Sequence, residues 1–174
     1  ALQLGHRDSV DFDFFSSNEI NTEKLFLNIQ NVFKDYSIKI VQNTKNTLTV
    51  LIDQNIKLSF FTYSYDLIEE LIDEPYIKIA SIKDIACMKL SAIVSRASMK
   101  DYIDLYYILK EIPLTVIIEC LKKKMSELEI NLVLKSLIYF KDIKQEKIKF
   151  KNNKNIEFNK IQDYFKKLIK EFNV

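Results

Sequence analysis

Glycine, proline, cysteine and histidine are all scarce in this sequence of 174 residues, which has one glycine, two prolines, two cysteines and one histidine. A single glycine rules out a P-loop or a G-x-G-x-x-G turn, because each of these phosphate-binding motifs needs at least two glycines. Two cysteines and one histidine are too few for a disulfide scaffold, a cysteine-based zinc site or a histidine-rich metal centre. Collagen-like and glycine/proline-rich low-complexity chains are excluded as well.

Long apolar runs and a strong charge imbalance are also lacking. No run approaches the ~20 apolar residues of a membrane span, and no signal-peptide pattern opens the chain, so we expect a cytoplasmic protein with reduced thiols. The formal net charge of +2 gives no overall basic signal for nucleic acid. The composition, 48% hydrophobic and 29% charged, is that of a globular chain. Its length suits one domain, or one domain with a helical extension.

The first half of the chain has the pattern of a mixed α/β structure. Residues 21–35 have the apolar spacing of an amphipathic helix, and residues 65–71 suggest a short one. Polar turns separate several β-rich segments and predict a meander of hairpins. The strands are expected at residues 9–15, 37–41, 47–52, 56–63 and 76–80.

From residue 81 onward the apolar period changes to that of helices. Ser81-x-x-Asp84 resembles a capping box and predicts a helix to about Arg96. Ser98-x-x-Asp101 opens a second helix that ends near Pro113. Further helices are expected at residues 114–124, 127–140 and 158–172, with a lysine- and asparagine-rich connector at 141–155. The predicted fold class is α+β, with an α/β core at residues 1–80 and a helical part at residues 81–174.

Asp11 and Asp13 are the first residues that could carry chemistry. On a strand, residues i and i+2 face the same side, so both carboxylates project from one face while Phe12 packs on the other. Two carboxylates about 6–7 Å apart along a strand can share one or two Mg²⁺ ions with substrate phosphates, as in two-metal phosphoryl transfer. The alternative interpretation is a strand with a solvated acidic face.

Lys89 lies in an apolar stripe of the helix that starts near residue 81. A lysine in such a place needs a partner for its ammonium, and Arg96 lies seven residues on, on the same face. The two cations could point into one cleft, or both could reach water at the helix edge. Asp101 and Asp104 are three residues apart on the next helix and could supply a general base. Asp101 also suits the third helical position, where an acid is favoured by the dipole.

Basic residues elsewhere are candidates for phosphate contacts. Arg7, just before the acidic strand, could hold a phosphate with two hydrogen bonds, whereas His6 beside it is too isolated for a metal site. Residues 141–174 contain ten lysines against five acidic residues. This tail and the three lysines at residues 122–124 are candidates for a salt-sensitive contact with an RNA backbone, or are simply solvated.

The order of these signals resembles that of the AbiEii-type nucleotidyltransferase toxins. Residues 4–16, LGHRDSVDFDFFS, resemble the opening motif of that family, which is roughly L-G-H-R-x-S-x-D-[ILF]-D-F-F. Residues 80–93, ASIKDIACMKLSAI, with Arg96, Lys100-Asp101 and Asp104-Leu105 after them, are similar to the second block. That block is S-x-x-D-[IL]-A-x-M-K, an arginine and then K-D-x-x-D-L. Residues 137–142, LIYFKD, are similar to the L-x-Y-F-x-D segment, so colinear blocks cover most of the chain.

The resemblance implies a DNA polymerase β-like nucleotidyltransferase fold and a toxin of a toxin–antitoxin system that acts in phage defence by abortive infection. It implies transfer of a nucleotide from a nucleoside triphosphate to RNA, with tRNA as the first candidate acceptor. Two Mg²⁺ ions and a cognate antitoxin are the implied cofactor and partner. The implied site residues are Asp11 and Asp13 for the metals, Lys89, Asp101 and Asp104 for catalysis, and Arg7, Ser9, Lys83, Arg96 and Lys100 for nucleotide or RNA.

Two departures from the family leave an alternative open. The family's Gly-Gly-Thr or Gly-Ser element would hold the triphosphate with backbone N–H groups about ten residues before the acidic pair. Ala1 lies after the position where this element would be, so we expect an N-terminally incomplete or shortened chain. In addition, residues 57–61 carry no third carboxylate, and Asp53 lies in a turn. The alternative is therefore a catalytically degenerate member of the family that acts as a protein-binding module.

Overall fold

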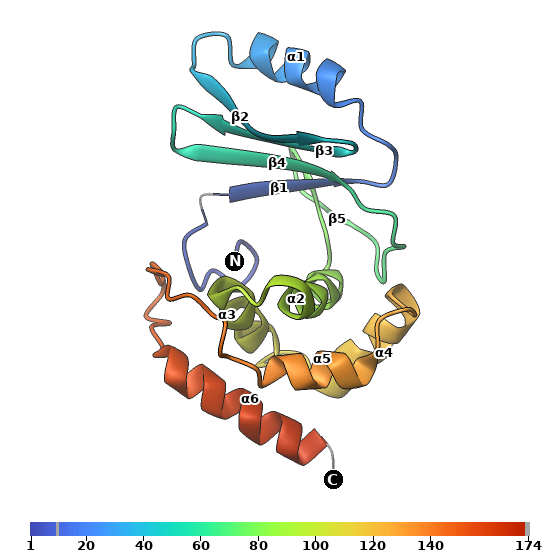
Figure 1. The fold of residues 1–174 in the computed structure, drawn as a ribbon, viewed down its shortest axis with the longest axis vertical. Coiled ribbons are helices and arrows are strands. Elements are labelled where there is room, and N and C mark those ends of the chain that lie inside the picture. Colours follow the sequence, from blue (N-terminus) through green and yellow to red (C-terminus); the bar gives the residue numbers. More distant parts are fainter. Residues whose placement is uncertain (10, 173–174) are drawn as a thin grey trace. The chain divides into compact units, whose positions relative to one another are not determined.

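The computed structural model describes residues 1–9 and 11–172 and has the predicted α+β class, with a small mixed sheet and a helical part (Figure 1). The chain forms two compact units. One is Ser9–Tyr65, and the other combines Ala1–Asp8 with Asp66–Val174. The division into parts 1–80 and 81–174 stays a prediction. Among the described residues, no helix is long and apolar enough to cross a membrane.

The unit Ser9–Tyr65 is a four-stranded sheet with one helix on one face (Figure 1). The strand order is β1-β4-β3-β2, in which β1 is parallel to β4 and the other pairs are antiparallel. In these hairpins Asn46, Asp53 and Gln54 adopt positive φ, as tight hairpin turns require. The elements are β1 (Asp11–Ser16), α1 (Thr22–Val32), β2 (Ile38–Thr44), β3 (Thr47–Ile52) and β4 (Ile56–Thr62).

The core of this unit lies between α1 and the sheet. The helix begins after Asn21, whose side-chain oxygen accepts a hydrogen bond from the backbone N–H of Lys24 at 2.9 Å. Its apolar stripe packs on alternate residues of the central strands, because a strand presents every second side chain to one face. The packed residues include Ile29 of the helix and Leu48, Val50, Leu58 and Phe60 of the sheet.

The other unit is built mainly from helices. Its elements are β5 (Ile72–Asp73), β6 (Lys78–Ile79), α2 (Ile82–Arg96), α3 (Met99–Ile108), α4 (Leu114–Lys124), α5 (Ile130–Leu137) and α6 (Phe158–Phe172). The predicted capping box is confirmed, since Ser81 Oγ accepts a hydrogen bond from the backbone N–H of Asp84 at 3.0 Å. Fully buried residues of the core include Leu90, Tyr102, Leu121, Leu137 and Phe165.

The predicted helix at residues 65–71 is wrong, because this segment is irregular. Two of its backbone N–H groups, those of Ile68 and Glu69, donate to the carboxylate of Asp84 at 3.0 and 3.3 Å. These amides therefore bind a side chain distant in sequence instead of a carbonyl one turn earlier. Two other helices are shorter than predicted: α3 ends at Ile108 rather than near Pro113, and α5 is confined to Ile130–Leu137.

Candidate active site

The edge strand β1 carries the predicted metal pair. Its register places Phe12 opposite Leu58, a residue of the sheet face that packs against α1. Because successive residues of a strand point to opposite faces, Asp11 and Asp13 lie together on the other face. Asp13 is exposed and Asp11 is half-buried, so neither carboxylate is sealed from solvent.

The neighbouring strand adds no carboxylate to this pair. Asp11 lies opposite Lys57 and Asp13 lies opposite Ser59. Asp53 accepts hydrogen bonds at 2.8 and 2.9 Å from the serine that precedes β2 and thereby supports the turn. Within the described residues, no group of three or more histidine, cysteine, aspartate or glutamate side chains could hold a metal ion. Mg²⁺ commonly takes one or two carboxylates and completes its shell with water and phosphate, so Asp11 and Asp13 fit it together with a phosphorylated substrate.

Asp104 of α3 is the centre of a buried ion-pair cluster in the helical unit. Its Oδ1 accepts hydrogen bonds from His6 Nε2 at 2.8 Å and from Arg7 Nε at 2.7 Å. Its Oδ2 accepts one from Arg7 Nη2 at 2.8 Å and lies 2.6 Å from Lys89 Nζ. The Asp104 side chain is 3% exposed, so these nitrogen atoms take the place of water around the carboxylate.

Lys89 of α2 links Asp104 to a second carboxylate, that of Asp101. Its Nζ donates to Asp101 Oδ1 at 2.8 Å, which confirms that this lysine has partners within the fold. Arg96 binds the same carboxylate through Nε at 2.9 Å and Nη2 at 3.2 Å. The Asp101 side chain is 1% exposed, that of Lys89 21% and that of Arg96 65%. Buried carboxylates thus hold two cations whose side chains reach the solvent.

The electrostatics of the cluster keep Asp104 and Lys89 ionised. Burial opposes ionisation of Asp104, but the hydrogen bonds from His6 and Arg7 and the charges of Lys89 and Arg7 outweigh it and hold the pKa of Asp104 far below its usual range. Burial likewise tends to lower the pKa of Lys89, yet the charges of Asp104 and Asp101 raise it above its ordinary value. At neutral pH the lysine is therefore an ammonium and Asp104 a carboxylate.

The segment that supplies His6 and Arg7 is held in place by the connector between α5 and α6. Arg7 forms an isolated antiparallel bridge with Phe150 of that connector. Backbone and side-chain hydrogen bonds continue on both sides of the bridge. They are Asp8 N–H to Lys149 O at 2.8 Å, Lys151 N–H to His6 O at 3.0 Å, Asn152 Nδ2 to Gly5 O at 2.8 Å and Lys154 Nζ to Leu4 O at 2.8 Å.

Gly5, the only glycine of the sequence, lies where the connector meets the N-terminal segment. Its φ is +54°, and a Cβ at this position would lie 3.1 Å from Asn152 Nδ2. We expect Gly5→Ala to lower the free energy of unfolding by about 1–2 kcal/mol, because a side chain disfavours the left-handed backbone. Urea unfolding measures this difference.

A matched variant reverses the sign of this effect. Ala97, the C-cap residue directly after α2, also has a left-handed backbone, with φ 46° and ψ 47°. Ala97→Gly should therefore raise the free energy of unfolding by up to about 1 kcal/mol. Equal unfolding midpoints for the wild type and Gly5→Ala would contradict the role given to this glycine.

The remaining predicted binding residues have simpler surroundings. Lys83 pairs with Glu69 at 2.6 Å, and Lys100 pairs with Glu146 at 3.2 Å. Ser9 is exposed. The roles of these three residues in nucleotide or RNA binding stay predictions.

The prediction that Lys124 contacts RNA is wrong. Its side chain is 0% exposed, and its Nζ lies 2.7 Å from Asp84 Oδ1 and donates to the backbone oxygen of Asp66. The pair ties the loop at residues 66–69 to the start of α2 and the end of α4. Residues 122–123 are exposed and stay candidates for RNA contact.

Sequence reasoning missed His6 as a member of the cluster. The imidazole is 0% exposed, and its ring stacks on Tyr107 with centroids 4.6 Å apart. Because ionised Asp104 can only accept, the hydrogen bond at 2.8 Å places the ring proton on Nε2 of His6. An isolated histidine has no periodicity that signals burial. Its place in the L-G-H-R string is the one signal that could have found it.

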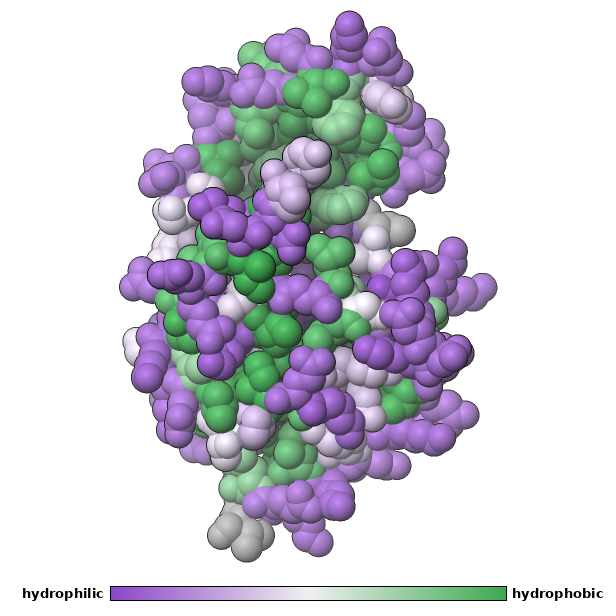
Figure 2. Space-filling view, turned by 180° about the vertical axis from the view of Figure 1, so that it is seen from behind, coloured by the Kyte–Doolittle hydropathy of each residue, from purple (hydrophilic) through white to green (hydrophobic). Residues whose placement is uncertain are grey.

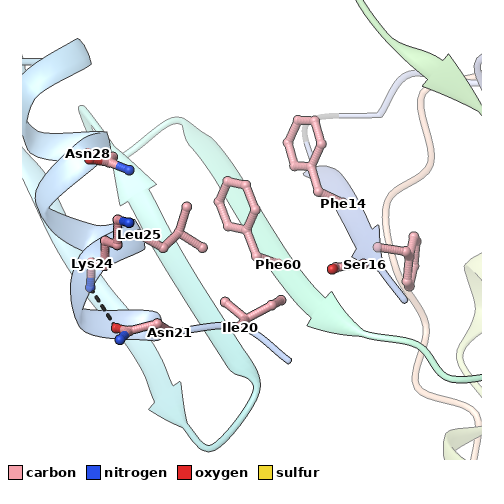
Figure 3. A pocket seen from close by; sticks show the side chains of 9 residues that line it. Phe14, Ser16, Ile20, Asn21, Lys24, Leu25, Asn28 and Phe60 are labelled. Carbon is pink, nitrogen blue, oxygen red and sulfur yellow. Dashed lines mark hydrogen bonds between the residues drawn. The ribbon is translucent and has the colours of Figure 1, made fainter. Parts of the chain in front are cut away.

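An open pocket of about 370 Å³ lies beside α1 in the sheet unit (Figure 3). Phe14 and Phe60 form its aromatic wall, with ring centroids 5.0 Å apart, and Asn21 and Lys24 lie at its edge. Phe60 packs with the α1 side of the sheet, whereas Asp11 and Asp13 lie on the opposite face. We therefore assign this pocket no part in metal binding. More widely, apolar side chains are exposed among hydrophilic ones on the molecular surface (Figure 2).

Carboxylates that can hold metal ions, and fixed lysine or arginine side chains, are both used by metal-dependent phosphoryl-transfer proteins. Residues 1–172 match the family described as nucleotidyl transferase AbiEii toxin, type IV toxin–antitoxin system. This chain therefore belongs to the AbiEii nucleotidyl transferase toxin family, as the sequence motifs predicted.

Individual proteins with similar sequence or structure are known. The uncharacterized protein aq_aa25 of Aquifex aeolicus (strain VF5) is 35% identical over 177 residues, which cover 98% of this chain and 82% of that protein. The crystal structure of JHP933 from Helicobacter pylori has a TM-score of 0.49 and 18% identity, covering 96% of this chain and 78% of that chain.

Proposed function

We propose that this toxin transfers a nucleotide from a nucleoside triphosphate to RNA, with tRNA as the acceptor to test first. The observation that carries the proposal is the pair Asp11 and Asp13, which β1 presents on the sheet face away from α1. These carboxylates would hold one or two Mg²⁺ ions. When bound, Mg²⁺ stabilises the attacking and leaving oxygens of phosphoryl transfer.

In this reaction an RNA hydroxyl oxygen attacks the α-phosphorus of the triphosphate. A new P–O bond forms, the bond to the β-phosphate oxygen breaks, and pyrophosphate leaves while the hydroxyl proton passes to solvent. Negative charge gathers on the leaving pyrophosphate, and fixed cations stabilise that charge most in the transition state. Lys89 and Arg96, which are 21% and 65% exposed, are the cations of the cluster that would meet it.

Asp101 and Asp104 would hold these cations in place and not remove the proton of the attacking hydroxyl. Both carboxylates accept hydrogen bonds from lysine or arginine, and both are almost fully buried. A general base works best when its pKa lies near the working pH. The low pKa of Asp104 is far from that condition.

The partner and the location follow from the family and the proposed substrates. A type IV toxin–antitoxin family implies a cognate antitoxin. The proposed substrates, nucleoside triphosphates and tRNA, are cytoplasmic, and we propose that the toxin acts there.

The test is transfer of label from each α-labelled nucleoside triphosphate to total tRNA in the presence of Mg²⁺. The wild type should label RNA with at least one nucleotide, and Asp11→Asn should lose at least about a hundredfold in rate, because a carboxamide binds Mg²⁺ weakly. Chelation of Mg²⁺ should have the same effect. Asp73→Asn, which changes a 76% exposed carboxylate of β5, is the matched control and should act as the wild type does.

Each contrary result has a distinct meaning. Undiminished transfer by Asp11→Asn would contradict the metal assignment but leave the activity intact. If no triphosphate is transferred and none binds even with Mg²⁺, the transfer function is wrong, and the alternative of a protein-binding module gains support.

A further inference from the structure

We propose that His6 is a positioning residue, whose Nε2–H fixes Asp104 and thereby sets the place of the Lys89 ammonium. The catalytic consequence rests on the proposed function, since it assumes that Lys89 meets a triphosphate. The structural part, the coupling of an imidazole to a lysine through one carboxylate, does not depend on any substrate.

The coupling follows from the division of donors between the two oxygens of Asp104. Oδ1 is shared by His6 Nε2 at 2.8 Å and Arg7 Nε at 2.7 Å. Oδ2 is shared by Arg7 Nη2 at 2.8 Å and Lys89 Nζ at 2.6 Å. A carboxylate is a rigid planar group, so the donors that fix Oδ1 also fix the direction in which Oδ2 meets the lysine. Without His6, Oδ1 would lose one of its two donors, and Arg7 alone would hold that side of the carboxylate.

The imidazole is itself fixed from two sides. Its ring stacks on Tyr107 of α3, whose hydroxyl donates to the backbone oxygen of Lys154 in the connector. The backbone oxygen of His6 accepts a hydrogen bond from Lys151 N–H at 3.0 Å. A donor held by both a helix and the connector can hold Asp104 in one orientation.

His6 acts through geometry and not through charge. Its Nδ1 is buried and has no hydrogen-bond partner among the described residues. A second ring proton would therefore be a buried donor without an acceptor, which is costly. Burial accordingly lowers the pKa of His6, although its hydrogen bond to Asp104 acts in the opposite direction. A neutral ring leaves the charge of the cluster unchanged.

The rival explanation is that His6 is a core residue that only packs against Tyr107. Two substitutions separate the explanations, because each keeps one property of the imidazole. His6→Gln keeps an N–H donor at nearly the reach of Nε2 and removes the ring. His6→Phe keeps a ring that can stack on Tyr107 and removes the donor.

The first readout is magnetic resonance of the nitrogen atoms. The sequence has one histidine, so its ring gives a single set of ¹⁵N signals. The neutral Nε2–H form is expected at pH 7, and an Nδ1–H form or an imidazolium would overturn the proposal. The ¹⁵N signal of the Lys89 ammonium, assigned with Lys89→Met, should persist in the wild type and in His6→Gln. It should broaden or vanish in His6→Phe.

The second readout is the rate of nucleotide transfer at equal folded fraction. His6→Gln should keep most of the wild-type rate, and His6→Phe should lose about 10–100-fold, the loss expected when a catalytic group is misplaced by about an ångström. Wild-type transfer by His6→Phe with impaired transfer by His6→Gln would show that only the ring matters. Equal impairment of both would also overturn the proposal.

These readouts separate failure of this inference from failure of the proposed function. If the wild type transfers no nucleotide, no rates can be compared, and the Lys89 signal alone tests the inference: a signal unchanged in His6→Phe overturns it. If His6→Phe does not fold, the ring form in the wild type and the Lys89 signal of His6→Gln decide. Loss of that signal in His6→Gln then overturns the proposal.

Discussion

Replacement of Asp104 by asparagine is expected to lower the free energy of unfolding by about 3–5 kcal/mol, the loss typical of removing one partner from a buried ion pair. The carboxylate is 3% exposed and meets His6, Arg7 and Lys89. An amide keeps one acceptor oxygen but turns an NH₂ group toward these donors, so at least one of their hydrogen bonds to residue 104 is lost while the Arg7 side chain stays only 8% exposed. Urea unfolding of both proteins at pH 7 measures the difference.

The contribution of Asp104 to the free energy of unfolding should depend on pH, and the direction of this dependence follows from its pKa. The pKa of Asp104 in the folded chain is far below the value of about 3.9 expected in the unfolded chain. The unfolded chain therefore binds more protons in acid, and the stability from this ionised group is present above about pH 4 and is lost as the pH falls toward the folded pKa. The difference in the free energy of unfolding between the wild type and Asp104→Asn should thus narrow between about pH 5 and pH 3.

The control for both measurements is Asp163→Asn, which should differ little from the wild type at every pH, because its carboxylate is 76% exposed. If the free energy of unfolding of Asp104→Asn differs from that of the wild type by the same amount from about pH 7 to pH 3, the assignment of an ionised, buried Asp104 is contradicted.

Local patterns located those elements whose apolar faces repeat along the chain. Helix α6 begins and ends at the predicted residues 158 and 172, and β3 has the predicted bounds of 47 and 52. The prediction of a helix at residues 65–71 failed because hydrogen bonds to Asp84 determine the shape of this segment. No local sequence pattern contains these contacts. Lys124 could have been placed correctly, since it continues the buried stripe of Ile117 and Leu121.

The candidate site was predictable where the motif itself carries the chemistry. Asp11 and Asp13 follow from strand geometry, and Lys89 follows from its place in an apolar stripe. His6 and the connector could not be found in this way. The bond between His6 and Asp104 spans 98 positions of sequence, and the bond between Gly5 and Asn152 spans 147. Such contacts arise only when the helices pack.

Asp84→Asn is the second variant with a large expected loss, again about 3–5 kcal/mol of the free energy of unfolding. It would leave the Lys124 ammonium at 0% exposure without the Asp84 carboxylate, while the backbone oxygen of Asp66 still accepts its hydrogen bond. The hydrogen bonds that Asp84 accepts from Ile68 N–H, at 3.0 Å, and from Ser81 Oγ, at 2.7 Å, would also be weakened. Urea unfolding measures the loss.

Lys124→Met should cost less, about 1–3 kcal/mol, because Asp84 keeps its backbone and serine donors when the ammonium is removed. Lys123→Met, one residue earlier on the exposed face of α4, is the matched control and should stay within about 0.5 kcal/mol of the wild type. A larger loss for Lys124→Met than for Asp84→Asn would contradict the argument that the carboxylate is the better supported partner.

The double variant Asp84→Asn with Lys124→Met completes the test. Because the two groups are in contact at 2.7 Å, their single losses should not add, and the double variant should recover about 1–3 kcal/mol of the sum. Strict additivity would mean that the ion pair contributes nothing specific. Where Lys124→Met still folds, its affinity for RNA should equal that of the wild type, because this lysine is committed to Asp84 and the loop at residues 66–69. A loss of RNA affinity at full folding would restore Lys124 as an RNA contact.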